Sequence, residues 1–133
     1  MVCVAVLAAA SAFGVLQRRR SGRVRVRGRD DGKRLGAAEL GESLGERATL
    51  VQFSSAFCAP CRATRRVLGE VAGLVPGVTH VEIDAEKHLG LVRRLGILKT
   101  PTVLVLDAEG RIVRRATGQP RRADVIAALG KAV

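Results

Sequence analysis

Tryptophan and tyrosine are absent from this chain, and phenylalanine occurs only three times in 133 residues. A protein that binds nucleic acid by stacking bases on aromatic rings is therefore excluded. Cysteine also occurs only three times, which is too few for a small fold held together by several disulfides. Aliphatic side chains must fill the interior, and 47% hydrophobic residues are enough for one domain.

The net charge of +11 is concentrated in one short segment. Residues 17–34 hold nine basic and two acidic side chains, a net charge of +7, which leaves +4 for residues 35–133. A small net charge made up of side chains of both signs, as in residues 35–133, is typical of an ordinary solvated surface. The charge pattern therefore predicts a polybasic linker at 17–34 and no nucleic-acid partner.

An uncharged run of 15 residues, Val2 to Leu16, precedes this linker. As a helix it would extend about 22 Å, less than the ~30 Å hydrocarbon core of a bilayer. A signal peptide carries its positive charges before the apolar run, whereas here the arginines follow it. A buried core helix fits the length, but the run has no polar face. We predict a single-pass membrane anchor at 1–16, with the arginines and the following domain on the cytoplasmic side.

Periodic segments begin at residue 35 and predict one α/β domain that extends to residue 133. Apolar strands alternate with amphipathic helices, and the last two strands are joined by the turn Asp107–Gly110. The expected elements are a short helix (37–44), a strand (49–54), a helix from the cysteine pair to 74, a strand (78–83), a helix (88–95), two strands (102–106 and 111–117) and a last helix from 120. This order predicts a compact sandwich of helices around a sheet.

Two cysteines, Cys58 and Cys61, stand where the first strand passes into an amphipathic helix. The unpaired N–H groups and dipole of a helix N-terminus favour a thiolate at the first cysteine. Pro60 fits the first helical turn because it has no N–H and a fixed φ. One turn of helix separates the two sulfurs, so Cys61 is placed to attack a disulfide formed at Cys58. This chemistry needs no cofactor.

Paired cysteines two residues apart also occur in zinc sites, which need four ligands when they are structural. Only His80 and His88 could complete such a site, and their separation of eight residues does not match the usual spacing of paired histidine ligands. We therefore expect no metal.

Residues 35–133, about three quarters of the chain, resemble the thioredoxin family. The resemblance rests on three segments in the family's order: LVQFSSAFCAPCR (50–62), VEIDAEKH (81–88) and GILKTPTVLVLDAEGRIVRRATG (96–118). It implies a thioredoxin-like three-layer sandwich of class α/β with a central mixed sheet, here preceded by an N-terminal hydrophobic helix.

The family resemblance also implies a substrate-binding rim around the cysteines. Pro101 matches a cis-proline that faces the cysteine pair, and the backbone of Thr100 before it would pair with an extended substrate strand. Gly118 matches a glycine in the loop before the last helix, and with Phe57 it would complete the rim.

Three residues depart from the family's pattern. Phe57 replaces a tryptophan as an aromatic lid, and Ala59 replaces a glycine between the cysteines, which should shift the redox potential. Gln52 stands where the family has a buried aspartate that helps to deprotonate the second cysteine, and an amide cannot accept a proton. His80 falls beside that position and is expected at the strand surface rather than in a proton relay.

The resemblance and the pair predict a membrane-tethered thiol–disulfide oxidoreductase that reduces or exchanges protein disulfides. Its partners would be protein disulfide substrates, a thiol reductant such as a thioredoxin reductase or another dithiol donor, and the membrane. Two alternatives remain open: an exported cell-envelope thiol reductase, which the charge order disfavours, and a non-catalytic redox-sensing module, which the retained pair disfavours.

Overall fold

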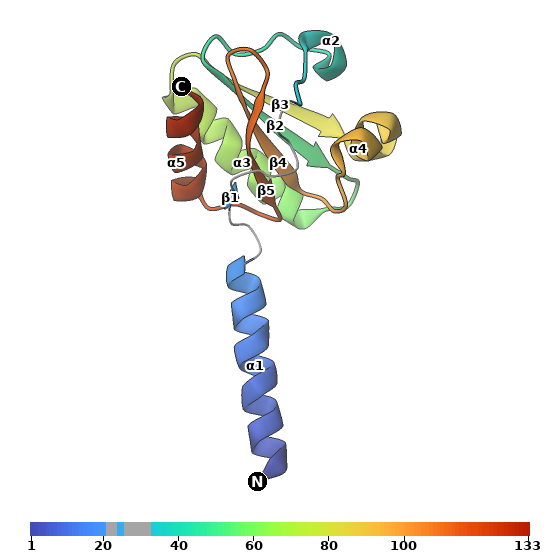
Figure 1. Ribbon diagram of the computed structural model, residues 1–133, viewed down its shortest axis with the longest axis vertical. Coiled ribbons are helices and arrows are strands. Elements are labelled where there is room, and N and C mark those ends of the chain that lie inside the picture. Colours follow the sequence, from blue (N-terminus) through green and yellow to red (C-terminus); the bar gives the residue numbers. More distant parts are fainter. Residues whose placement is uncertain (21–23, 26–32) are drawn as a thin grey trace.

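The computed structural model describes residues 1–20, 24–25 and 33–133. After an N-terminal helix α1 (Val2–Arg20) the chain forms a sheet with helices on both faces (Figure 1). The elements are β1 (Val24–Arg25), α2 (Ala37–Leu40), β2 (Ala48–Ser54), α3 (Ala59–Leu74), β3 (Val78–Asp84), the 3-10 helix η1 (Ala85–Lys87), α4 (Leu89–Leu95), β4 (Thr102–Asp107), β5 (Ile112–Thr117) and α5 (Arg122–Ala132). From α2 onward, the predicted order of helices and strands is confirmed.

The sheet is mixed, with the strand order β1-β5-β4-β2-β3. Strand β2 pairs parallel with β3 and antiparallel with β4, and β5 runs antiparallel to both β4 and β1. The parallel pair is connected by α3, as a crossover between parallel strands requires.

Alternation along the strands divides the core into two apolar layers. Val51 and Phe53 of β2 belong to the layer shared with α2 and α4, whereas Ala48 and Leu50 belong to the layer shared with α3 and α5. The molecule is therefore a three-layer α/β sandwich, as the sequence predicted.

The alternation in β2 continues past Leu50, so that Gln52 and Ser54 also face α3. Both side chains are buried, and they sit beneath the first turns of that helix. A polar patch therefore interrupts the apolar layer at the place where the cysteines lie.

Helix α2 and the predicted linker both differ from the sequence-based expectation. Helix α2 ends at Leu40 rather than at residue 44, because Gly41 adopts the left-handed conformation (φ 73°). The sheet also reaches back into the segment predicted to be linker. Val24 pairs with Ala116, and Lys33 accepts a hydrogen bond from the backbone N–H of Ile112 through its carbonyl oxygen.

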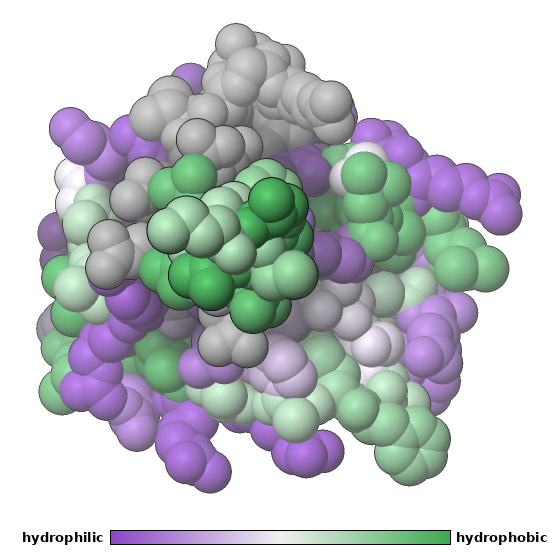
Figure 2. Space-filling model, turned by 90° about the horizontal axis from the view of Figure 1, so that it is seen from below, coloured by the Kyte–Doolittle hydropathy of each residue, from purple (hydrophilic) through white to green (hydrophobic). Residues whose placement is uncertain are grey.

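Helix α1 projects away from the sandwich (Figure 1), and every residue from Met1 to Gln17 is exposed. Its apolar side chains form a group at the centre of the view from the α1 end (Figure 2). A bilayer-spanning segment was predicted here. No helix within residues 1–20, 24–25 and 33–133 has the length and apolar content that crossing a membrane requires.

Candidate active site

Cys58 and Cys61 are joined by a disulfide, and their Cα atoms lie 5.2 Å apart. Cys58 is the N-cap residue of α3, and its Sγ accepts a hydrogen bond of 3.2 Å from the backbone N–H of Cys61. Pro60 lies in the first turn of the helix, as predicted. Cys58 is half-buried whereas Cys61 is 1% exposed. The first sulfur is therefore the one that a substrate can reach.

The predicted rim residues meet at the edge of the sheet where β2 ends and β4 begins. The peptide bond between Thr100 and Pro101 is cis, which confirms the prediction from the resemblance. In the register of β2 and β4, Phe53 pairs with Thr102, so Pro101 lies beside the end of β2 that leads to the cysteines. The Thr100 hydroxyl also lies 2.7 Å from the hydroxyl of Ser55 in that segment.

Gly118 lies at the same edge, because Thr117 of β5 pairs with Thr102 of β4. Its backbone N–H donates a hydrogen bond of 2.8 Å to the carbonyl oxygen of Pro101. Its φ of 86° lies in the left-handed region that favours glycine. The structure thus brings the cysteine pair, the cis-proline and this glycine together, although they are spread over about sixty residues of chain.

Phe57 and Ala59 flank Cys58 and are both exposed. Phe57 is 102% exposed and has a φ of 58°, which is uncommon for an aromatic residue. The predicted aromatic lid therefore stands out from the surface beside Cys58.

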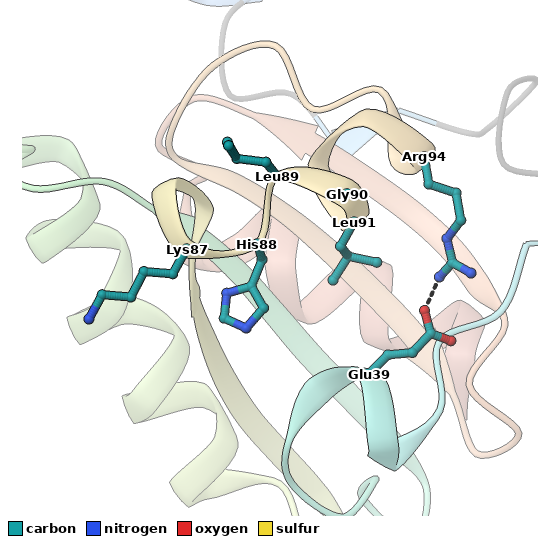
Figure 3. A pocket seen from close by; sticks show the side chains of 7 residues that line it. All are labelled: Glu39, Lys87, His88, Leu89, Gly90, Leu91 and Arg94. Carbon is teal, nitrogen blue, oxygen red and sulfur yellow. Dashed lines mark hydrogen bonds and ion pairs between the residues drawn. The ribbon is translucent and has the colours of Figure 1, made fainter.

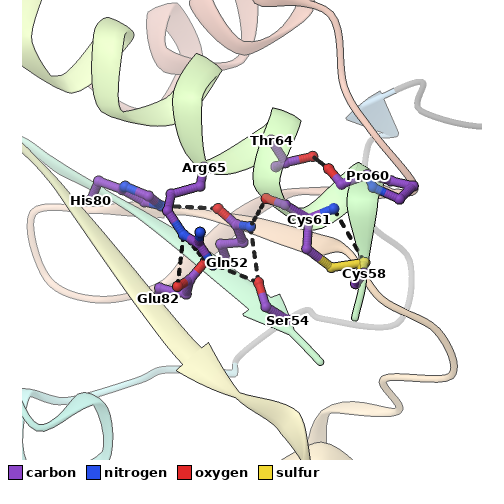
Figure 4. Close-up of polar contacts among 9 residues, drawn as sticks. All are labelled: Gln52, Ser54, Cys58, Pro60, Cys61, Thr64, Arg65, His80 and Glu82. Atoms are coloured by element: carbon purple, nitrogen blue, oxygen red, sulfur yellow. Dashed lines mark hydrogen bonds and ion pairs between the residues drawn. A yellow bond between two sulfur atoms is a disulfide. The ribbon is translucent and has the colours of Figure 1, made fainter. Parts of the chain in front are cut away.

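Behind Cys61, Gln52 is at the centre of a polar network (Figure 4). Its Nε2 donates hydrogen bonds to the carbonyl oxygen of Cys61 (2.8 Å) and to Ser54 Oγ (2.9 Å). The Ser54 hydroxyl donates to Glu82 Oε2 (3.1 Å), and Glu82 also accepts hydrogen bonds from Arg65 Nε on α3. Gln52 is fully buried and all its hydrogen-bonding groups are used.

His80 completes this network, which corrects the expectation of a strand-surface histidine. Its Nε2 lies 3.2 Å from Gln52 Oε1, the acceptor end of the amide, so Nε2 carries a hydrogen. Burial lowers the pKa of His80 below its ordinary value, with Glu82 raising it in opposition and Arg65 lowering it further. Because Nε2 is already protonated in the neutral ring, His80 cannot take up a proton at the atom that faces Gln52.

Sequence reasoning identified Gln52 and His80 but not Ser54, Glu82 or Arg65. These three residues join the network through the parallel register, in which Gln52 pairs with Glu82, and through the docking of α3. The alternation of polar residues at 80 and 82 was the one signal that these two side chains lie on the same face of the sheet.

A separate open pocket of about 340 Å³ lies between α2 and α4 (Figure 3). Glu39 and Arg94, which form an ion pair, line it together with Lys87, His88, Leu89, Gly90 and Leu91. None of the predicted site residues takes part. Within residues 1–20, 24–25 and 33–133, no group of three or more histidine, cysteine or acidic side chains is placed to hold a metal ion.

Comparisons with known proteins identify the same kind of domain that the fold and the cysteine pair indicate. The family model of the thioredoxin-like domain matches residues 38–133. Thioredoxin from Chlamydia muridarum is 27% identical over 90 residues, which cover 68% of this chain and 87% of that protein. Thioredoxin from Alicyclobacillus acidocaldarius is 34% identical over 79 residues, 58% of this chain and 74% of that protein.

Among solved structures, a variant thioredoxin from Halobacterium salinarum superposes with a TM-score of 0.60 at 18% identity, over 65% of this chain and 75% of that one. At that identity the likeness shows the fold alone. The fold and the cysteine pair define a thiol–disulfide oxidoreductase. The chain belongs to the thioredoxin-like domain family.

Proposed function

We propose that this protein reduces or exchanges disulfides of protein substrates, with Cys58 as the attacking thiol and Cys61 as the resolving thiol. The observation that carries the proposal is the asymmetry of the pair at the start of α3. Cys58 is accessible and its sulfur accepts the Cys61 N–H, whereas Cys61 is buried beneath it. The helix N-terminus stabilises negative charge on Cys58 when the disulfide is reduced.

The reaction proceeds through two thiol–disulfide exchanges. The Cys58 thiolate attacks a substrate disulfide, which forms a mixed disulfide and releases one substrate thiolate that takes a proton from water. Cys61 then loses its thiol proton and attacks Cys58 Sγ, which releases the second substrate thiol and forms the Cys58–Cys61 disulfide. A thioredoxin reductase or another dithiol donor returns two electrons and two protons to the pair.

Substrate recognition is assigned to the rim formed by Thr100, Pro101, Gly118 and Phe57. Because Pro101 has no backbone N–H, an extended substrate would pair with the main chain of Thr100. The exposed ring of Phe57 would cover an apolar side chain next to the substrate disulfide.

Insulin reduction with dithiothreitol as electron donor tests this activity. The wild-type chain should accelerate the precipitation of the insulin B chain, and the double variant Cys58→Ser/Cys61→Ser should not. Equal rates for the two proteins would reject catalysis and favour a non-catalytic interaction module.

Membrane attachment through α1 is the second part of the proposal, with the catalytic domain on the cytoplasmic side. Its support is an exposed helix whose residues 2–16 carry no charge and which is followed by the arginine-rich segment. Continuous exposed apolar surfaces mark interaction sites, and arginines placed next to one are attracted to anionic headgroups. The same arginines resist transfer across a bilayer.

Two measurements test the attachment and its side. Extraction of membranes with carbonate should leave the protein in the pellet if α1 is inserted, whereas release would indicate peripheral binding. A reporter fused after Val133 that works only in the cytoplasm should be active. Activity of a reporter that requires export would instead favour a cell-envelope reductase.

A further inference from the structure

The chain enters the sheet at the edge that carries the active site. Val24, the first residue of β1, pairs with Ala116 of β5, and Arg25 pairs with Arg115. Strand β5 runs toward Gly118, whose N–H contacts Pro101. Since β1 is antiparallel to β5, it starts beside Gly118 and runs away from it. Figure 1 shows α1 at the same end of the sandwich as the first turn of α3.

Little chain separates α1 from this entry point. Helix α1 ends at Arg20, and three residues lie between it and Val24. Four Cα–Cα steps of ~3.8 Å allow at most about 15 Å between the Cα atoms of Arg20 and Val24. The end of α1 therefore stays close to the rim of the active site whatever path those three residues take.

We propose that the active-site edge faces the membrane surface and that the substrates are disulfides in membrane-attached proteins, close to the lipid headgroups. This inference rests on the proposed attachment through α1. An anchor that entered at the opposite edge, where the turn Asp107–Gly110 lies, would direct the cysteines away from the membrane toward soluble substrates. The register of β1 selects the first arrangement.

Exposed side chains on the active-site edge suit a headgroup surface. Phe57 is 102% exposed and Leu98, in the segment before Pro101, is 89% exposed. The exposed Lys99 follows Leu98 directly. An apolar side chain next to a cation is the combination that favours the interface of an anionic membrane. Phe57 directly precedes Cys58, and Leu98 and Lys99 lie in the segment that leads to the cis-proline of the rim. A substrate segment lying along the membrane would therefore meet the lipid-facing side chains and the rim together.

The expected consequence is a preference for substrates held on the same surface. Tethering enzyme and substrate to one membrane raises their effective concentration, provided that the geometry lets them meet. A disulfide peptide linked to lipid should therefore be reduced at least ~10-fold faster than the same peptide free in solution.

Orientation is measured first, on vesicles of equal parts phosphatidylglycerol and phosphatidylcholine that carry a headgroup-linked quencher. Single-cysteine variants Leu98→Cys and Ala108→Cys, with the three native cysteines replaced by serine, receive the same fluorophore. Ala108 is exposed in the turn at the opposite edge and is the matched control. The label at 98 should be quenched several-fold more than the label at 108. Equal quenching, or stronger quenching at 108, would overturn the orientation.

Substrate choice is measured with the full-length protein and the two forms of the disulfide peptide. A flexible twenty-residue insertion between Gly22 and Arg23 should remove most of the preference for the lipid-linked peptide, without changing the rate on the free one. The same insertion after Val133 is the control and should change neither rate. An unchanged preference in the Gly22 insertion variant would overturn the inference.

Flotation of the wild-type chain with the same vesicles separates the two proposals. If the protein does not float with the vesicles, attachment through α1 is rejected and the inference falls with it. If it floats but shows no preference for the lipid-linked peptide, attachment stands and the assignment of membrane-attached substrates is rejected. Flotation with the expected quenching and preference supports both.

Discussion

The side-chain amide of Gln52 donates a 2.8 Å hydrogen bond to the carbonyl oxygen of Cys61, and this bond ties the first turn of α3 to the centre of the sheet. Both residues are buried. The contact places a neutral donor behind the resolving cysteine, where the resemblance to thioredoxins implies a carboxylate. Position 52 therefore holds Cys61 in place but cannot accept its proton.

Replacement of Gln52 by aspartate should accelerate the resolution of the mixed disulfide near neutral pH. A well-placed general base contributes roughly 10²–10⁴-fold, and we expect at least ~10-fold because the shorter side chain is not optimally placed. Stopped-flow measurement of the second exchange step gives the rate. A buried carboxylate also costs stability, so the melting temperature is measured alongside.

Gln52→Asn is the control, because asparagine has the length of aspartate without its charge. Equal acceleration in both variants would assign the effect to packing. No acceleration in a stably folded Gln52→Asp variant would show that another group takes the proton. Glu82 is then the first candidate, since it is linked to Gln52 through the hydroxyl of Ser54.

His80 should make the stability of the protein depend on pH between about 5 and 7. Burial lowers its pKa in the folded state, whereas the unfolded chain keeps a value near ~6.5. Below that value the unfolded chain binds more protons than the folded one, so the free energy of unfolding should fall as the pH falls. Above it, neither state is protonated and this contribution is flat.

Urea unfolding of wild type and His80→Gln across this range checks the effect. Glutamine keeps a donor for Gln52 Oε1 but does not titrate. The free energy of unfolding of His80→Gln should therefore fall less toward pH 5 than that of wild type. His88→Gln, which changes an exposed histidine, is the matched control. Parallel curves for wild type and His80→Gln would contradict the prediction.

The sequence was sufficient to predict the elements with strong periodicity and the loops that form the site. The apolar run of β2 and the helical spacing after Cys58 each match one element. Turn signals such as the one at Asp107 mark the strand ends. The cis bond at Pro101 followed from the resemblance, because an X-Pro bond in isolation favours the trans form.

Features that depend on register or on long-range contact could not be read from the sequence. Strand β1 is two residues long within an arginine-rich segment, and only its pairing with β5 makes it a strand. The contact between His80 and Gln52 joins residues 28 apart in the chain. To predict this contact, one would have to know both that β2 pairs in parallel with β3 and which face of the sheet α3 covers.

Substitution by alanine should lower the stability of the protein at Gly118 and raise it at Gly69. Gly118 has a φ of 86°, so a Cβ there adds strain of roughly 1–2 kcal/mol. Gly69 lies within α3, where an added Cβ meets no atom within 4 Å, and alanine should stabilise the helix by about 0.5–1 kcal/mol. Thermal unfolding of both variants tests the signs.

Gly118→Ala should also lower the rate of insulin reduction more than its loss of stability explains, because Gly118 contacts Pro101 in the rim. Gly69→Ala should leave that rate unchanged. A Gly118→Ala variant with full activity would remove this glycine from the proposed rim.

Cys61→Ser should trap substrate proteins as mixed disulfides, whereas Cys58→Ser should trap none. In Cys61→Ser the attacking thiol remains at the accessible start of α3, but the group that would release the substrate is gone. In Cys58→Ser the remaining thiol is 1% exposed and cannot meet a substrate sulfur.

Both variants are built with Cys3→Ser, because Cys3 is an exposed free cysteine that could form unrelated disulfides. Gels run without and with reductant count the trapped complexes, and the double variant Cys58→Ser/Cys61→Ser gives the background. Complexes that form with Cys58→Ser but not with Cys61→Ser would reverse the two roles, and the helix N-terminus would then not be what selects the nucleophile.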